Sequence, residues 1–278
     1  MKKLTKQLNM HALLKISKRI LSLGLYIFCK YISILLFITS GKCTKNRQKL
    51  KSLYNIHKNK RCFIIGNGPS LKPEDLETLY LNNEISFAVN KISYIFPETN
   101  WRPTYYSVFD DFLPRKIKNI ISETPASKKF FRKNSFLFTR KVNGECLYCN
   151  TKGNRNLLKN PKFSADISEK IFAIATVTYV SMQIAVYMGI TEIYLLGIDN
   201  AYSLDRKKNG TIVKNNSIKS YFGALEKTDN RNVGALWEMD IAYKAANEYA
   251  KQNDIKIYNA TRGGKLEIFE RVNFDSLF

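Results

Sequence analysis

Residues Gly66-Asn67-Gly68-Pro69-Ser70 form a glycine turn of a type that can hold the phosphate of a ligand. The turn follows an apolar run, 62–65, and precedes a stretch, 71–79, that has the leucines and early acidic residues of a helix. Glycine tolerates a positive φ and lets the backbone approach a ligand, and a helix N-terminus presents free N–H groups to an anion. The pattern is neither a P-loop nor Gly-x-Gly-x-x-Gly, because Leu71 stands where the third glycine would be. Such a turn can also be a simple corner between strand and helix.

Polar residues follow three further apolar runs. Asn90 ends the run 84–90, Asp110 ends 104–110 and is followed by Asp111, and Asp199 ends 192–199. Ligands of open parallel sheets bind beyond the carboxyl ends of the strands, where a partly desolvated carboxylate can accept a proton. Asp110, Asp111 and Asp199 are therefore the candidate catalytic bases. Each could instead be a helix cap or turn residue, and Asp110 and Asp199 would be the ligands if Mg²⁺ is used.

A second glycine turn, Thr261-Arg262-Gly263-Gly264, follows the apolar run 255–259. It carries a cation at the end of a predicted strand, with Lys265 directly after it. Together with Arg231, these cations are candidates for taking up the negative charge of a phosphate leaving group. All four residues of the turn belong to the predicted nucleotide-binding site.

These residues require a frame of alternating strands and helices. Such an alternation predicts a doubly wound, mostly parallel, Rossmann-like α/β sheet. The insertion 200–233 is long and polar, which is typical of a mobile lid or a disordered loop. Gly189 is expected to cap the C-terminus of a helix, and 136–138 and 146–148 are candidates for short strands. The predicted strands are 62–65, 84–90, 104–110, 192–199 and 255–259, and the predicted helices are 71–79, 179–188 and 234–250.

The positive charge of the chain is concentrated near its beginning. The formal net charge is +22, and residues 1–60 hold fourteen Lys and Arg with no Asp or Glu. The same segment contains an almost wholly apolar run, 20–39, interrupted by Lys30. The combination of positive charge with a long apolar run favours a membrane surface over a nucleic acid as the partner. The run could either span the bilayer or lie in its interface. We expect a membrane-associating helical segment at 1–45, a linker at 46–60 and a nucleotide-binding domain at 61–278.

Cysteine and histidine limit the chemistry further. The five cysteines are scattered, and Cys146 and Cys149 form a lone C-x-x-C that favours ordinary thiols over a zinc site. The two histidines, His11 and His57, both lie in the basic segment. A histidine general base from residues 61–278 is therefore excluded.

The glycine turn with Leu71, Asn90 after the second strand, and the stretch from Gly189 to Asp199 together resemble the bacterial family-42 sialyltransferases and the related MptE-like domain family. That domain is found in archaeal hydroxymethylpterin pyrophosphokinases, in flagellin-modifying motility accessory factors and in proteins of surface-polysaccharide loci. The resemblance covers roughly residues 61–270, and the Thr261–Gly264 turn is closer to the MptE-like branch. It implies a variant of the GT-A glycosyltransferase fold.

The resemblance also implies a nucleotide or nucleotide-sugar site formed by 66–70 and Asn90, to which we add Thr176, Thr178 and Gly197. In the sialyltransferases the donor is a CMP-activated nonulosonic acid, no metal is strictly needed, and a histidine in the lid region deprotonates the acceptor. Here 220–240 contains no histidine, and the Thr-Ser-Gly segment of those enzymes is altered to Thr-Val-Thr. Neither that base nor a sialyl donor is carried over.

The expected function is a membrane-associated glycosyltransferase of cell-surface polysaccharide or glycan biosynthesis. Its partners would be a nucleotide sugar, of the CMP type by resemblance, a glycan or lipid-linked acceptor, and the inner membrane leaflet at the cytoplasmic face. One alternative is a Mg²⁺-dependent 6-hydroxymethylpterin pyrophosphokinase, and Mg²⁺ is the one cofactor considered. Another is a non-enzymatic, basic nucleotide- or nucleic-acid-binding protein, which is disfavoured because the excess charge is confined to 1–60.

Overall fold

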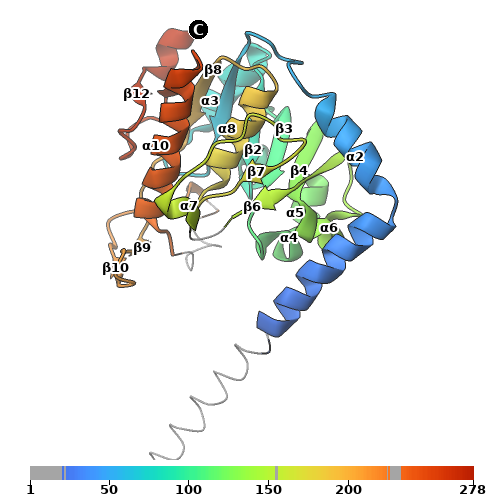
Figure 1. The fold of residues 1–278 in the computed structure, drawn as a ribbon. Coiled ribbons are helices and arrows are strands. Elements are labelled where there is room, and N and C mark those ends of the chain that lie inside the picture. The colour runs from blue at the N-terminus through green and yellow to red at the C-terminus, as the bar shows by residue number, and fades with distance from the viewer. Residues whose placement is uncertain (1–20, 22, 154–155, 224, 226–232) are drawn as a thin grey trace, which may run out of the picture.

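An eight-stranded parallel sheet forms the centre of the protein (Figure 1). The computed structural model describes residues 21, 23–153, 156–223, 225 and 233–278. The strand order is β12-β11-β8-β1-β2-β3-β4-β5, and every neighbouring pair is parallel, which confirms the predicted α/β sheet. The strands are β1 (Arg61–Ile65), β2 (Ser86–Val89), β3 (Tyr105–Val108), β4 (Lys128–Arg132), β5 (Cys146–Cys149), β8 (Glu192–Leu196), β11 (Lys256–Asn259) and β12 (Glu270–Arg271).

Both faces of the sheet are buried, which explains why its central strands are nearly continuous apolar runs. In β1, Cys62 and Ile64 belong to one hydrophobic cluster, while Phe63 and Ile65 belong to the other. Successive side chains of a strand point to opposite faces, so each cluster lies on its own side of the sheet. All four side chains are fully buried, and each such burial stabilises the fold by about 1.5–3 kcal/mol.

Helices cover the two faces as separate layers (Figure 1). One layer contains α7 (Asn156–Lys159), α8 (Val177–Tyr187) and α10 (Leu236–Gln252). The other contains α3 (Pro73–Leu81), α4 (Leu113–Lys116), α5 (Lys118–Glu123), α6 (Phe136–Thr139) and the 3₁₀ helices η1 (Ile92–Glu98) and η3 (Phe274–Leu277). The remaining elements are α2 (Lys42–Lys51), η2 (Lys133–Ser135) and two small sheets, β6 (Thr151–Lys152) with β7 (Ile171–Phe172), and β9 (Leu204–Arg206) with β10 (Ile212–Lys214).

Helix α8 is the central helix of its layer. Its residues are almost all buried, and Gly189 follows its C-terminus with φ of +87°, as predicted for a C′ cap. The amides of Asn55, His57 and Asn59 donate to the carbonyls of residues 187, 188 and 189 at 2.8–3.1 Å. These bonds satisfy carbonyls that the end of a helix leaves unpaired.

The N-terminal helix (Leu23–Thr39) meets α2 at an angle of 86°. Phe37 on the first helix and Leu50 and Leu53 in and after α2 are buried in the core clusters. The segment 46–60, predicted as a linker or a short helix, consists of the end of α2 followed by turns, and it packs on the sheet domain. Within the described residues no single helix is both long and apolar enough to cross a membrane, although the bent pair meets that criterion when taken together.

One local prediction was wrong, and one strand was not predicted. Residues 136–138, proposed as a strand, form helix α6, in which Phe136 packs its ring 5.3 Å from that of Phe37 and 5.1 Å from that of Tyr148. Strand β4 was not predicted, because its two apolar residues are flanked by Lys and Arg. Tertiary packing decides both cases, since neither segment has a clear apolar period.

The order of the strands reverses between β1 and β8. The chain runs outward from β1 to β5 in one direction, and from β8 to β12 in the other. The amide of Gly66 donates to Leu196 O at 2.8 Å, and the amide of Gly68 donates to Gly197 O at 2.9 Å. We call this contact between the loops after β1 and β8 the backbone seam.

The two glycines of the first turn are needed for this close approach. A Cβ on Gly66 would lie 2.3 Å from Gly197 O, and a Cβ on Gly68 would lie 1.8 Å from Asp199 Oδ2. Neither glycine has a positive φ, so that part of the prediction was wrong. Glycine is required at both positions because the loop after β8 leaves no space for a Cβ.

The backbone seam predicts that Gly68→Ala lowers the free energy of unfolding by about 1–3 kcal/mol, the usual cost of overpacking. Urea denaturation measures this change. Gly24→Ala is the control, because nothing lies within 4 Å of a Cβ there and alanine favours a helix. Equal stability of the two variants would show that the loops are not closely packed.

Candidate functional site

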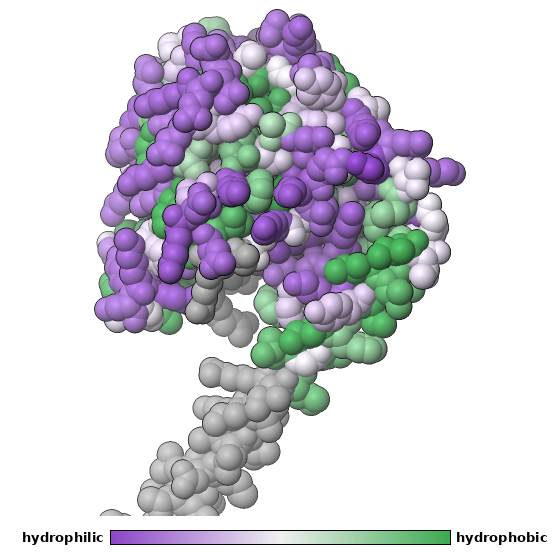
Figure 2. Space-filling model, viewed as in Figure 1, coloured by the Kyte–Doolittle hydropathy of each residue, from purple (hydrophilic) through white to green (hydrophobic). Residues whose placement is uncertain are grey.

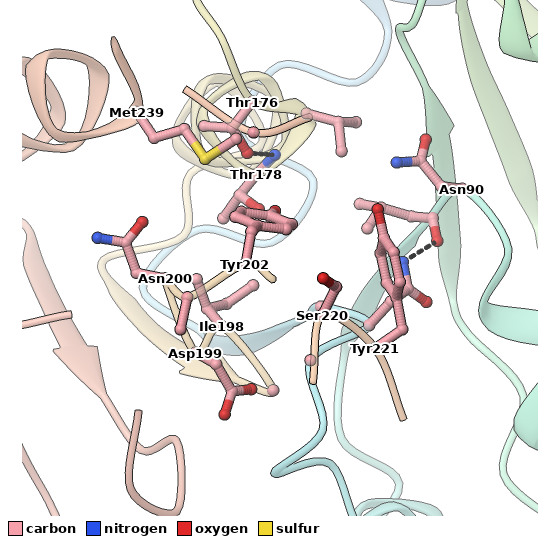
Figure 3. A pocket seen from close by; sticks show the side chains of 18 of the residues that line it. Asn90, Thr176, Thr178, Ile198, Asp199, Asn200, Tyr202, Ser220, Tyr221 and Met239 are labelled. Atoms are coloured by element: carbon pink, nitrogen blue, oxygen red, sulfur yellow. Dashed lines mark hydrogen bonds between the residues drawn. The ribbon is translucent and has the colours of Figure 1, made fainter. Parts of the chain in front are cut away.

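A cavity of about 260 Å³ lies at the carboxyl ends of the strands, where the strand order reverses. Such a position is the usual ligand site of a doubly wound sheet. Its walls come from the loops after β1, β2, β3 and β8, from the start of α8, and from both ends of the insertion 200–233 (Figure 3). The predicted site residues that line it are Gly66, Asn67, Gly68, Asn90, Asp110, Thr176, Thr178, Gly197 and Asp199.

The N-terminus of α8 faces this cavity. Residues 175–178 line the wall, and Thr176 Oγ1 accepts a hydrogen bond from the Thr178 amide at 3.2 Å (Figure 3). The first amides of a helix have no partner within the helix, and its dipole favours negative charge at this end. An anionic group of a ligand would be stabilised here.

The helix predicted at 71–79 begins two residues later than expected, and its N-terminus carries its own acidic residues. Helix α3 begins at Pro73, and its first turn already carries Glu74 and Asp75. These carboxylates complement the positive end of that helix. Neither Pro69 nor Ser70 lines the cavity.

Three asparagines of the cavity have buried amide oxygens without a hydrogen-bond partner among the described residues. They are Asn67, Asn90 and Asn200. The Asn67 amide group donates to Val89 O at 3.1 Å, and that of Asn200 donates to Asp240 at 2.9 Å, so in both cases the oxygen is left over. An unsatisfied buried acceptor costs about 1–3 kcal/mol, which a ligand with O–H or N–H donors would recover. The cavity therefore suits a ligand that combines an anion with hydroxyl or amino groups.

Asp199 links the loops after β1 and β8, and its carboxylate is poorly placed to act as a base. Its Oδ2 accepts a hydrogen bond from Ser70 Oγ at 2.7 Å, and its carboxylate points away from Thr178 and Tyr202 (Figure 3). Burial raises the pKa of Asp199, and the hydrogen bond from Ser70 opposes this shift. The carboxylate links the two sides of the backbone seam.

Asp110 is the carboxylate of the cavity that is open to solvent. It is exposed, and its Oδ1 accepts the amides of Phe112 and Leu113, both at 2.7 Å. Neither bond involves Oδ2. The carboxylate is thus oriented by the amides at the start of α4, while its Oδ2 is left free of these two bonds.

A second cavity of about 290 Å³ adjoins the first and shares Asn90, Asp110 and residues 175–177 with it. Asp111 lines this second cavity, where Arg132 pairs with it at 2.9 Å and Asn134 donates to it at 3.0 Å. Asp111 is therefore committed to an ion pair. Asp110 lies where the two cavities meet.

The turn after β11 supports the site from outside the cavity. Thr261 Oγ1 accepts the Ile198 amide at 3.1 Å, and a Cβ on Gly264 would lie 2.9 Å from Asp199 Cα. Arg262 binds Asp75 through two nitrogens at 2.9–3.0 Å and also pairs with Asp275. None of the residues Thr261 to Gly264 lines the cavity, and the Arg262 guanidinium is paired with carboxylates in place of the phosphate that the sequence predicted for it.

Three tyrosines that line the cavity were not among the predicted site residues. Tyr202 and Tyr221 come from the two ends of the insertion, with ring centroids 6.3 Å apart, and Tyr243 comes from α10. Burial raises the pKa of Tyr202, so its hydroxyl stays protonated and can donate to an anion. The insertion itself contains the hairpin β9–β10, and Ser203 and Ser220 are hydrogen-bonded across its base at 2.9 Å. No periodic pattern of residues marks these tyrosines.

Some predicted features lie elsewhere. His57 contacts the Tyr105 hydroxyl at 2.6 Å, at the start of β3 and hence at the opposite end of that strand from the cavity. Among the described residues no group of three or more His, Cys, Asp or Glu is arranged to hold a metal. Arg231, residues 1–20 and most of 224–232 lie outside the described residues.

The parallel sheet, with helices on both faces and a reversal of strand order, defines a Rossmann-like α/β protein. The family model of 6-hydroxymethylpterin diphosphokinase MptE-like proteins matches residues 38–205, which is more than half of the chain. The chain belongs to this MptE-like family. No curated protein has a significant match to it.

Solved glycosyltransferases have a related fold. The MAf glycosyltransferase from Magnetospirillum magneticum AMB-1 is 16% identical with a TM-score of 0.51, over 85% of this chain. The match spans only 39% of the length of that protein. The sialyltransferase CstII from Campylobacter jejuni, solved with cytidine-5′-monophosphate, is 18% identical over 77% of this chain and 85% of its own, with a TM-score of 0.44. At 16% identity the similarity to the MAf glycosyltransferase concerns the fold alone.

Proposed function

We propose that the protein is a glycosyltransferase that uses a nucleotide-activated sugar. The observation that carries this proposal is the meeting, in one cavity, of the α8 N-terminus with the unpaired amide oxygens of Asn67, Asn90 and Asn200. The helix terminus suits a phosphate, and the amide oxygens suit the hydroxyl and amino groups of a nucleoside or a sugar. A CMP-sugar donor is the form that the sequence resemblance favours.

The proposed transfer uses Asp110 as the base. The acceptor hydroxyl loses its proton to the Asp110 carboxylate as its oxygen attacks the anomeric carbon of the donor sugar. The bond from that carbon to the phosphate oxygen breaks, and its electron pair leaves with the nucleotide. The α8 N-terminus and the Tyr202 hydroxyl would stabilise the negative charge on the departing phosphate. The acceptor would occupy the second cavity, which Asp110 also borders.

The family description favours a second candidate, a 6-hydroxymethylpterin diphosphokinase. That reaction transfers a diphosphate from ATP and would require carboxylates to bind Mg²⁺. Consumption of ATP in the presence of the pterin alcohol and Mg²⁺, without transfer from any nucleotide sugar, would support this candidate over the first.

We further propose that residues 1–45 hold the protein at the cytoplasmic face of the membrane, where lipid-linked acceptors of surface glycans are found. The N-terminal helix leaves large apolar side chains exposed, and Figure 2 shows them as a hydrophobic surface on that helix. Exposed apolar area of this extent marks an interaction site. Its exposed residues include Leu21, Leu23, Leu25, Ile27, Phe28, Tyr31, Leu35 and Ile38.

Nucleotide binding is tested with Asn67→Ala. One of CMP, UDP, GDP, ADP or their sugars should raise the melting temperature of the wild-type protein, because a ligand of the native state stabilises it by mass action. The variant should bind that ligand about tenfold or more weakly, since it loses a buried acceptor. Asn160→Ala, on the surface, is the matched control. The absence of a shift with the whole panel would contradict a nucleotide site.

The role of Asp110 is tested with Asp110→Asn. Turnover of the nucleotide sugar should fall about 100-fold or more, the contribution expected of a general base, while nucleotide binding stays unchanged. Asparagine also caps a helix, so the bonds to Phe112 and Leu113 can be kept. Asp254→Asn, at an exposed position, is the control. Unchanged turnover in Asp110→Asn would exclude this base.

Membrane association is tested with the double variant Phe28→Gln and Leu35→Gln. These side chains are 61% and 55% exposed, so the fold should survive while binding to lipid vesicles falls about tenfold or more. The control double variant replaces Tyr80 and Leu81, which are 51% and 70% exposed on α3. Vesicle sedimentation measures both, and equal binding would contradict the role of the N-terminal helix.

A further inference from the structure

We propose that the bend between the N-terminal helix and α2 is a binding site for the phosphate headgroup of an anionic lipid. Two cavities of about 330 and 320 Å³ lie at this bend, and both are lined by Lys42, Phe136 and Arg140. They are distinct from the two cavities at the ends of the strands. We call this site the headgroup site, and its cations are Lys42, Lys45, Lys49, Arg140 and Lys141.

The headgroup site has a large uncompensated positive charge. The one carboxylate in its walls is that of Glu145, which Lys49 binds at 2.7 Å and Lys128 at 2.9 Å. The other four cations of the site, Lys42, Lys45, Arg140 and Lys141, form no ion pair with another described residue. A pocket of this charge attracts an anion, and arginine beside lysine is well suited to phosphate.

The start of α2 adds to the positive potential. Gly41 has a φ of +66° and makes no side-chain cap, and the first turn of α2 contains Lys42 and Lys45 but no acidic residue. Cations near a helix N-terminus are unfavourable because they repel the positive end of the helix dipole. A bound phosphate would relieve this repulsion. By contrast, the last carbonyls of the preceding helix are partly satisfied, since the Thr39 and Ser40 hydroxyls donate to residues 35 and 37.

The neighbouring apolar surface identifies the anion as part of a lipid. Leu36 and Thr39 line one of the cavities, while Leu35 and Ile38 in the same turns are 55% and 57% exposed. Apolar side chains on one side of the bend and cations on the other match the boundary between acyl chains and headgroups. A free phosphate ion would use only the cations.

The folded domain thereby contributes to the contact with the membrane. Arg140 directly follows α6, which packs on the sheet, whereas Lys42 belongs to α2. A headgroup held between them would fix the orientation of the sheet relative to the bilayer. This inference rests on the proposed membrane location and is independent of the chemistry at the nucleotide site.

The test measures binding of the full chain to vesicles of phosphatidylcholine, with and without phosphatidylglycerol. The variant of the headgroup site is Lys42→Gln, Arg140→Gln and Lys141→Gln. The control has the same change of charge at Lys244, Lys251 and Lys256, which are exposed on α10 and β11. Unfolding midpoints and nucleotide binding are measured for both variants to show that the fold is intact.

The wild-type protein should bind the anionic vesicles about tenfold or more tightly than the neutral ones. The headgroup-site variant should lose most of that preference, and the control should keep it. Sodium phosphate should displace the protein only at concentrations far above that of the anionic lipid, because free phosphate can occupy the cations but not the neighbouring apolar surface. Equal losses in the two variants, or strong displacement by phosphate, would overturn the proposal. Failure of the wild-type protein to bind any vesicle would overturn the membrane location as well, while leaving nucleotide binding as a separate result.

Discussion

The backbone seam between the loops after β1 and β8 determines where the rest of the site can lie. Gly66 and Gly68 donate to the carbonyls of Leu196 and Gly197, and the loops are too close for a Cβ on either glycine. Ser70 and Thr261 extend this contact through their hydroxyls, to Asp199 and to the Ile198 amide. The floor of the cavity is therefore fixed by backbone geometry. Polar groups on its other walls are left to meet a ligand.

This arrangement separates the structural role from the ligand-binding role. A glycine turn after the first strand is usually interpreted as a phosphate-binding loop. Here its glycines pack against the loop after β8, and acidic residues occupy the first turn of the helix that follows. The anion site that we propose lies instead at the start of α8, which enters the cavity from the opposite layer. Because Asn67 and Asn90 face the same space, one ligand can contact both walls.

The sequence was sufficient for those features that depend on local pattern. Asn90 and Asp199 line the cavity as expected, because the carboxyl ends of parallel strands meet at one edge of the sheet. Thr176, which the family resemblance suggested, lines it as well. Arg262 was misplaced because its partners, Asp75 and Asp275, are distant in sequence and no local pattern connects them. Tyr202 and Tyr221 were missed for a related reason, since a polar insertion has no period that indicates which side chains turn inward. A local sequence pattern does not show which residues that are distant in sequence will contact each other.

Helix α8 also connects the cavity to the basic N-terminal segment. Its first residues line the cavity, and at its far end three carbonyls accept the amides of Asn55, His57 and Asn59. Eleven residues at 1.5 Å each make a rod about 16 Å long. Phe37, Leu50 and Leu53 are buried in the core, so the segment that precedes β1 completes the fold around this rod. A truncation at residue 45 would remove Phe37 together with the exposed apolar face, and its effect on membrane binding could not be separated from an effect on folding. Substitution of exposed side chains alone keeps the two apart.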